Sequence, residues 1–194
     1  MNLKIEVLSK EHDKLICDFD CTAEDSAIRC FKSAKRKKLL GHSEDLNNFI
    51  KNEALNEQEQ GLNTTHLLII DDVLVGYISL CADNLRVSLG EQSDLNLLYY
   101  NIPAIKIARM AVQNNLQTMK YGELLVKFAV HISNSIRQIG VGVKFITVDC
   151  YEHRTSYYQK YGFVENEIQD DDRLPHHPKS FRLDIDEFLD KLTT

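Results

Sequence analysis

Residues 102–139 read IPAIKIARMAVQNNLQTMKYGELLVKFAVHISNSIRQI, and they carry the strongest structural signal in the chain. Ile102 to Val112 is largely apolar on both sides of an extended chain, which is typical of a central strand buried on both faces. The last part places six apolar residues on one helical stripe: Leu124, Leu125, Phe128, Ile132, Ile136 and Ile139. Between them, Gln113 to Gly122 is polar and rich in turn formers. The stretch therefore predicts a strand, a turn and the start of a helix, where free backbone N–H groups and the helix dipole favour phosphate.

The bulk composition is that of an ordinary globular protein, with 43% hydrophobic and 27% charged residues. A length of 194 residues predicts one domain, residues 1–194, with a sizeable core. The net charge of −6 excludes a wholly basic nucleic-acid binder but leaves room for a local basic patch. The sequence has neither a membrane-length apolar run nor a secretory signal, and its five scattered cysteines favour reduced thiols. We therefore expect a cytoplasmic protein with no membrane partner.

Periodicity and turn residues predict a mixed α/β fold. Helices are expected at 24–40, ended by Gly41, at 46–54, capped by Ser43, and at 124–139 and 153–161. Strands are expected at 3–8, 64–70, 74–81, 102–112, 144–150 and 181–185, with another opening at Phe163, while 83–101 reads as a loop or short helix. This order predicts a mixed, mostly antiparallel sheet with helices on both faces and one βαβ crossover from Ile102 to Cys150.

The run Lys35-Arg36-Lys37-Lys38 has two interpretations. Four adjacent cations suit an RNA phosphate backbone, but a solvated helix face is the commoner reason for such a run. A metal site is not expected, because the spacing of Cys17 and Cys21 and of the nearby histidines matches no zinc pattern, so these cysteines read as small core residues.

The element order and two motifs resemble the GCN5-related N-acetyltransferase (GNAT) superfamily over nearly the whole chain. The acetyl-CoA motif of that family, Arg/Gln-x-x-Gly-x-Gly/Ala, is matched by Gln117 to Gly122, with Lys120 in place of the middle glycine. The second motif is a tyrosine in a short helix before Gly-Phe, here Tyr158 before Gly162 and Phe163.

The chain looks most like one branch, the acetyltransferase toxins of toxin–antitoxin pairs and their stand-alone relatives. Residues 46–61, 109–116 and 157–163 carry this likeness, together with Phe-Asp-Cys at 19–21. Residues 17–45 read as an insertion that contains the basic helix. The branch implies an aminoacyl-tRNA acceptor, an antitoxin partner and a homodimer, although no sequence feature fixes the oligomeric state.

The resemblance implies which residues hold the donor, acetyl-CoA. Backbone groups of the turn would bind the diphosphate, and the end of the preceding strand would hold the pantetheine arm. These residues are Gln117, Thr118, Met119, Lys120, Tyr121, Gly122 and Glu123 for the turn, and Met110, Ala111 and Val112 for the strand. We expect Lys120 to take ordinary helical angles. The alternative is a plain strand–turn–helix with a surface lysine, and for Met110 a core side chain.

Tyr158 is the residue that the resemblance assigns to catalysis. A tyrosine hydroxyl can protonate a departing thiolate, because its pKa of about 10 lies above that of a thiol. The alternative is a packing aromatic beside Tyr157 and Tyr161. Arg109 lies mid-strand, where it either faces the acceptor or pairs with an acid such as Asp149 or Glu152. No general base stands out, and water can serve.

These features predict an N-acetyltransferase that moves an acetyl group from acetyl-CoA to a primary amine by direct attack in a ternary complex. The amine of an aminoacyl-tRNA follows from the toxin branch, whereas the acidic net charge favours a small-molecule or protein amine. A non-catalytic CoA-binding or interaction module is a further alternative, favoured by Lys120.

Overall fold

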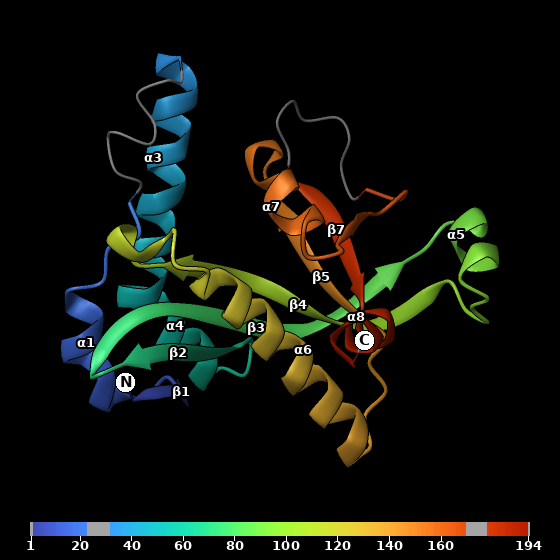
Figure 1. The fold of residues 1–194 in the computed structure, drawn as a ribbon, viewed down its shortest axis with the longest axis horizontal. Coiled ribbons are helices and arrows are strands. Elements are labelled where there is room, and N and C mark those ends of the chain that lie inside the picture. The colour runs from blue at the N-terminus through green and yellow to red at the C-terminus, as the bar shows by residue number, and fades with distance from the viewer. Residues whose placement is uncertain (1, 23–31, 170–177, 194) are drawn as a thin grey trace. The chain divides into compact units, whose positions relative to one another are not determined.

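The computed structural model describes residues 2–22, 32–169 and 178–193. Its strands are β1 (Leu3–Val7), β2 (Thr64–Ile70), β3 (Val73–Arg86), β4 (Asn101–Val112), β5 (Phe145–Cys150), β6 (Val164–Glu165) and β7 (Lys179–Asp184). Its helices are α1 (Asp13–Cys17), α3 (Ser33–Asn48), α4 (Ala54–Glu59), α5 (Leu89–Asp94), α6 (Tyr121–Ile139), α7 (Thr155–Gln159) and α8 (Ile185–Thr193) (Figure 1). Short 3-10 helices are η1 (Lys10–His12), η3 (Asn114–Leu116) and η4 (Glu152–Arg154), and η2 (Phe49–Glu53) is a π-helix.

The strands follow the order β1-β2-β3-β4-β5-β7-β6 in the sheet. β1 and β2, β2 and β3, β5 and β7, and β6 and β7 pair antiparallel, whereas β4 and β5 pair parallel through the α6 crossover. This arrangement confirms the predicted mixed, mostly antiparallel α/β fold with one βαβ crossover.

The chain divides into two compact units, residues 1–80 with 109–126 and residues 81–108 with 127–194. In the first unit, α1, η2 and α4 pack on β2 and β3 around Phe19, Phe49 and Tyr77, while Leu125 of α6 contacts Gly76 of β3. In the second unit, Phe145 of β5 packs with Leu85 and Ile102. Within the described ranges, no helix is both long and apolar enough to cross a membrane.

Strand β2 and the long helix α6 match their predicted positions closely. β2 has the predicted bounds, and Asp71 and Asp72 form its turn to β3 with φ values of 47° and 61°. A two-residue turn with both φ angles positive has the twist that a right-handed hairpin requires. β3 runs five residues further than expected, to Arg86, and α5 follows inside the segment that was expected to be a loop or short helix.

The predicted break at Gly41 and Ser43 is wrong. α3 continues through both residues and passes directly into η2 and α4. The Ser43 hydroxyl donates to the Leu39 carbonyl at 3.2 Å, so it is satisfied inside the helix instead of capping a new one. Leu39 and Ser43 are both buried, and this packing offsets the cost of about 1 kcal/mol for a glycine inside a helix. Residues 24–31 of the predicted helix lie outside the described residues.

The buried stripe of α6 differs from the predicted one. The fully buried positions are Leu125, Val126, Ala129, Val130 and Ser133, whereas Ile139 is 82% exposed. The large residues at 124, 128, 132 and 136 lie at the partly buried margin of that stripe. Leu125 is common to both stripes, while the other buried positions hold smaller residues, which let the helix pack closely on its neighbours.

Among the four described cysteines, none forms a disulfide. Cys21 is buried, as predicted for a small core residue, but Cys17 is exposed at the end of α1, so its predicted core position is wrong.

Candidate functional site

The turn that leads into α6 is the predicted diphosphate-binding element. Two of its amides are already used within the protein: Met119 donates to the Leu116 carbonyl at 3.0 Å, and Glu123 donates to the Lys120 carbonyl at 3.0 Å. The expectation that every amide from Met119 to Glu123 is available to a ligand is therefore wrong. Among the described residues, no protein acceptor is recorded for the amides of Lys120, Tyr121 and Gly122. These three amides open a 19-residue helix, where the helix dipole favours an anion.

Lys120 adopts a left-handed backbone conformation with φ = 60°. The prediction of ordinary helical angles is therefore wrong. A side chain in this region costs about 1 kcal/mol, because its Cβ lies too close to the neighbouring carbonyl oxygen. A glycine avoids this cost, which gives a physical reason for the glycine that the GNAT motif has at this position. Lys120 thus keeps the turn at a cost in strain, and its exposed side chain adds a cation beside the three amides.

Gln117 uses its side chain within the protein. Its Nε2 donates to the Cys21 carbonyl at 2.9 Å and to the Val112 carbonyl at 3.3 Å. The side chain therefore ties the turn to the N-terminal segment and to the end of β4. Gln117, Thr118 and Met119 are all exposed.

The end of β4 is the predicted site for the pantetheine arm. Pairing with β5 runs from Ala104 to Ile107, while β4 itself continues to Val112. In this last part Ala111 is buried, and Met110 and Val112 are half-buried. Backbone groups of Met110 to Val112 remain the proposed contacts, because main-chain recognition needs no particular side chain.

Gly76 is a residue that sequence reasoning missed. A Cβ at this position would lie 2.7 Å from the Ala111 carbonyl oxygen, so only glycine lets β3 approach this part of β4 so closely. The Gln113 amide also donates to the Val75 carbonyl at 2.8 Å, which fixes the strand end from which the turn departs. The available signal was a lone glycine inside the apolar run from Val73 to Leu80.

Arg109 lies on β4 with its guanidinium carbon 5.5 Å from the centroid of the Phe49 ring. Phe49 opens the π-helix η2 and stacks on Tyr77 at 6.0 Å between ring centroids. A cation above an aromatic ring is attracted by the negative face of the ring. Arg109 is exposed, so its side chain rests on η2 while its head remains reachable from solvent.

Asp149, one predicted partner of Arg109, instead pairs with Lys106 at 2.5 Å. Burial alone would lower the pKa of Lys106, but the hydrogen bond and charge of Asp149 outweigh burial and raise it. Next to this pair, Thr147 donates to Asp83. Lys106 therefore remains a cation, and the ion-pair partner of Asp149 is Lys106, which belongs to the same unit.

Tyr158 lies on α7 in the second unit, and its side chain is buried. Its ring meets those of Tyr157 and Phe163 edge to face, with centroids 5.2 and 5.3 Å away, so its orientation is fixed. Burial, followed by the neighbouring Cys150 thiol, raises the pKa of Tyr158 above its ordinary value. Burial likewise raises the pKa of Cys150 to about 11. Tyr158 therefore stays protonated at neutral pH.

Tyr157 and Tyr161 pack on each other edge to face with centroids 5.1 Å apart, and Lys160 lies over both rings. These contacts agree with the packing role that the sequence suggested for them. α7 is five residues long, and the left-handed Gly162, with φ = 91°, turns the chain toward β6.

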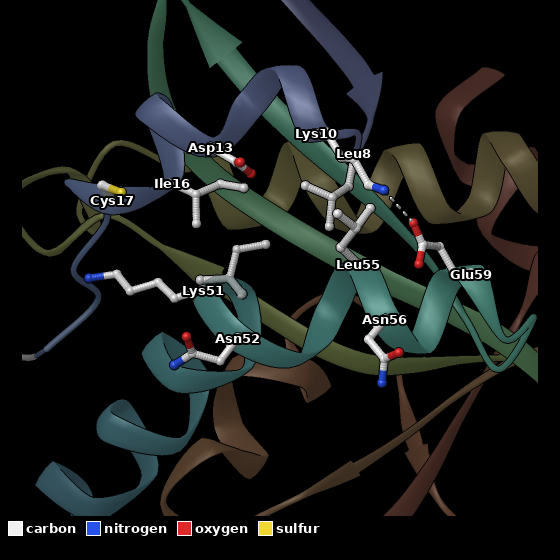
Figure 2. A pocket seen from close by; sticks show the side chains of 11 residues that line it. Leu8, Lys10, Asp13, Ile16, Cys17, Lys51, Asn52, Leu55, Asn56 and Glu59 are labelled. Carbon is white, nitrogen blue, oxygen red and sulfur yellow. Dashed lines mark ion pairs between the residues drawn. The ribbon is translucent and has the colours of Figure 1, made fainter.

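In the first unit, a groove of about 620 Å³ lies between α1 and the η2–α4 helices. Figure 2 shows an apolar floor that includes Leu8, Ile16 and Leu55, and a rim on which Lys10 pairs with Glu59 at 3.4 Å. None of the residues predicted for donor binding or catalysis lines this groove.

Residues 20–180 match the family described as the acetyltransferase (GNAT) domain. The chain belongs to this GNAT family. The match covers most of the sequence and confirms the expected family, and with it an acetyl-CoA-dependent N-acetyltransferase. A search of curated proteins finds no match to the chain.

Solved structures similar to this GNAT protein include the toxin acetyltransferases AtaT and KacT. AtaT in complex with acetyl-methionyl-tRNAfMet is 20% identical over the full length of both chains, with a TM-score of 0.73. A tyrosine-to-phenylalanine mutant of KacT is 17% identical, with 98% of this chain and 99% of that chain covered and a TM-score of 0.74. An AtaT mutant bound to the C-terminus of the antitoxin AtaR and to acetyl-CoA is 18% identical over the full length of both chains, with a TM-score of 0.67. At these identities the likeness shows a shared fold.

Proposed function

We propose that this GNAT protein acetylates a primary amine by direct attack on acetyl-CoA, with Tyr158 as the general acid. The observation that carries the proposal is the match to the GNAT domain over residues 20–180, which includes α7 and its buried, edge-to-face packed Tyr158. The neutral amine forms a C–N bond to the acetyl carbon, and the C–S bond of the thioester breaks. Tyr158 gives its proton to the departing thiolate, and the new ammonium releases a proton to water.

Binding of the donor would rest on backbone groups. The amides of Lys120, Tyr121 and Gly122 at the start of α6 suit the diphosphate, because orphan N–H donors and the helix dipole act together there. The Lys120 ammonium adds a charge-assisted contact to phosphate. Main-chain groups of Met110, Ala111 and Val112 would hold the pantetheine arm and polarise the thioester carbonyl.

Titration calorimetry with acetyl-CoA, followed by an assay for free CoA thiol with a panel of amines, tests the proposal. We expect saturable binding and amine-dependent release of CoA. The panel should include small polyamines, peptides with free N-termini and charged tRNA. Binding without turnover on every acceptor would instead favour a non-catalytic CoA-binding module.

For the acceptor, we propose the α-amino group of an aminoacyl-tRNA. The supporting observations are the similarity to AtaT, whose structure holds acetyl-methionyl-tRNAfMet, and the exposed cations Lys35, Lys37 and Lys38 on α3. Arg109, exposed above η2, is the proposed acceptor contact on β4. The antitoxin-bound AtaT structure supports a small antitoxin as a further partner.

A growth experiment separates this acceptor from a small-molecule or protein amine. Expression of the wild-type chain alone should arrest growth, and co-expression of an antitoxin from a neighbouring gene should restore it. Normal growth on overexpression, together with turnover of a small amine, would overturn the tRNA proposal while leaving the acetyltransferase proposal in place.

A further inference from the structure

Three segments that are far apart in the sequence meet beside the turn before α6. The Asp20 amide donates to the Gln113 side-chain oxygen at 2.9 Å, and the Asn114 amide donates to the Asp20 carbonyl at 2.8 Å. Gln117 reaches back to the Cys21 carbonyl at 2.9 Å. Both ends of the segment from Gln113 to Gln117 are thus bonded to residues 20 and 21.

The end of α3 completes this contact through Asn47. Its side-chain oxygen accepts from the Cys21 amide at 2.9 Å, while its Nδ2 donates to Asp20 Oδ1 at 2.8 Å. The Thr22 amide donates to the same Asp20 oxygen at 2.8 Å. Hydrogen bonds from the Thr22 side chain and amide, and then from Asn47, lower the pKa of Asp20, so it stays a carboxylate acceptor.

The adjoining residues anchor this segment in the core. Phe19 and Cys21 are 1% and 5% exposed, and the Phe19 ring meets the Tyr77 ring edge to face at 5.5 Å. The hydrogen bonds thus connect the turn to a rigid part of the first unit. A turn held from outside keeps its amides oriented before a ligand arrives, which lowers the entropy cost of binding.

We infer that Asp20, Asn47, Gln113 and Gln117 form a strap that fixes the turn from Gln117 to Gly122 in the geometry that receives the donor diphosphate. The inference rests on the proposed function. It makes Gln117 and Asn47 positioning residues, because their side chains are bonded to protein groups and act on the donor through the turn. If the network only stabilises the fold, its loss should affect all donors equally. If it positions the turn, its loss should weaken binding of the diphosphate alone, and the experiment separates these two outcomes.

The experiment compares acetyl-CoA with acetyl-pantetheine, a donor that lacks the diphosphate. Asn47→Asp removes the amide donor and places a second carboxylate beside Asp20. We expect kcat/KM for acetyl-CoA to fall about tenfold, mainly through KM, as loss of one charge-assisted hydrogen bond implies. With acetyl-pantetheine the change should stay below about threefold, because the strap acts on the diphosphate.

A swap and a matched control complete the set. The double variant Asp20→Asn with Asn47→Asp again places one hydrogen-bond donor opposite one acceptor. It should therefore recover most of the lost preference for acetyl-CoA over acetyl-pantetheine. Asn48→Asp makes the same chemical change one residue further along α3, where the side chain is exposed and contacts Glu53. This control should keep the wild-type preference for acetyl-CoA over acetyl-pantetheine. Gln117→Glu, at an exposed position, tests the other end of the strap without the folding risk of a core change.

Equal losses on both donors would overturn the strap, because they would show a general structural effect. An unchanged acetyl-CoA KM in both Asn47→Asp and Gln117→Glu would overturn it as well. A wild-type protein that neither binds nor uses acetyl-CoA would overturn the proposed function, and the strap with it. A wild-type preference for acetyl-CoA that both variants lose selectively would support the strap.

Discussion

Tyr158 is the residue proposed to protonate the leaving thiolate. Removal of its hydroxyl in Tyr158→Phe leaves the ring to pack on Tyr157 and Phe163, so the fold should persist. We expect kcat to fall by about 100-fold or more, the usual contribution of a general acid, with little change in acetyl-CoA affinity. Steady-state kinetics and calorimetry check this. Tyr161→Phe is the matched control, and its kcat should stay within about threefold of the wild-type value. A Tyr158→Phe variant with full activity would rule out the role of Tyr158 as general acid.

Lys120 carries a backbone strain that glycine would relieve. Lys120→Gly should raise the free energy of unfolding by up to about 1 kcal/mol, which for a chain of this size raises Tm by about 2–4 °C. Calorimetric melting measures this. Lys127→Gly, in the interior of α6, is the control and should destabilise by about 1 kcal/mol. A lower Tm for Lys120→Gly would show that the lysine side chain stabilises the turn by more than its backbone costs.

At the scale of elements, Gly76 sets the distance between β3 and β4. Gly76→Ala places a methyl group 2.7 Å from the Ala111 carbonyl oxygen, and because this neighbour is backbone the strands must separate. We expect a loss of about 1–3 kcal/mol of stability together with weaker donor binding. Urea unfolding and calorimetry with acetyl-CoA measure the two effects.

Gly41→Ala is the same glycine-to-alanine change at a position where we expect a gain in stability instead of a loss. Among the described residues, no atom outside its own stretch of helix backbone lies within 4 Å of the position of its added methyl group, and Gly41 is inside α3. Alanine there should stabilise by up to about 1 kcal/mol. Equal effects of the two substitutions would contradict the close approach at Gly76.

α5 is fastened to β7 by a buried ion pair between Glu91 and Arg182. Burial would raise the pKa of Glu91, but the amides of Ser88 and Glu167 and the Arg182 charge outweigh it and lower the pKa. A lowered folded-state pKa gives stability that is present above the unfolded pKa of about 4.3 and is lost as pH falls through the folded value. Glu91→Gln should therefore cost about 2 kcal/mol at pH 7 and much less below about pH 4.

Urea unfolding at pH 7, 5 and 3.5 measures this dependence. Glu187→Gln is the control, because its i,i+4 contact with Lys191 at 4.0 Å is exposed and should contribute less than about 0.5 kcal/mol. A Glu91→Gln cost that stays constant from pH 7 to 3.5 would contradict the sign of the pKa shift.

At the scale of the whole molecule, a chain of net charge −6 concentrates cations at the start of one helix. No acidic side chain lies in the first turn of α3 to compensate the dipole, so this placement disfavours the isolated helix. Neutralisation of Lys35, Lys37 and Lys38 to Ser should weaken binding of charged tRNA and reduce the slope of log K against log salt by about 2. Filter binding at several salt concentrations measures this.

Neutralisation of Lys14, Lys127 and Lys191, which are also exposed, makes the same change in net charge elsewhere. The salt slope of that control should stay close to the wild-type value. If both triple variants lose tRNA binding equally, net charge and not α3 governs the interaction.

Sequence patterns alone predict the order of the strands, the βαβ crossover, the family and the position of the turn before α6, but not helices α1 and α8. The predicted features depend on local patterns: apolar periodicity, the hairpin at Asp71 and Asp72, and a motif of six residues. Three features emerge only in the folded chain: α3 runs through Gly41, Lys120 is left-handed, and Gln117 is bonded to Cys21. Such features depend on contacts between residues far apart, 96 positions in the case of Gln117 and Cys21. Packing and long-range hydrogen bonds there outweigh the local preferences that a sequence pattern records.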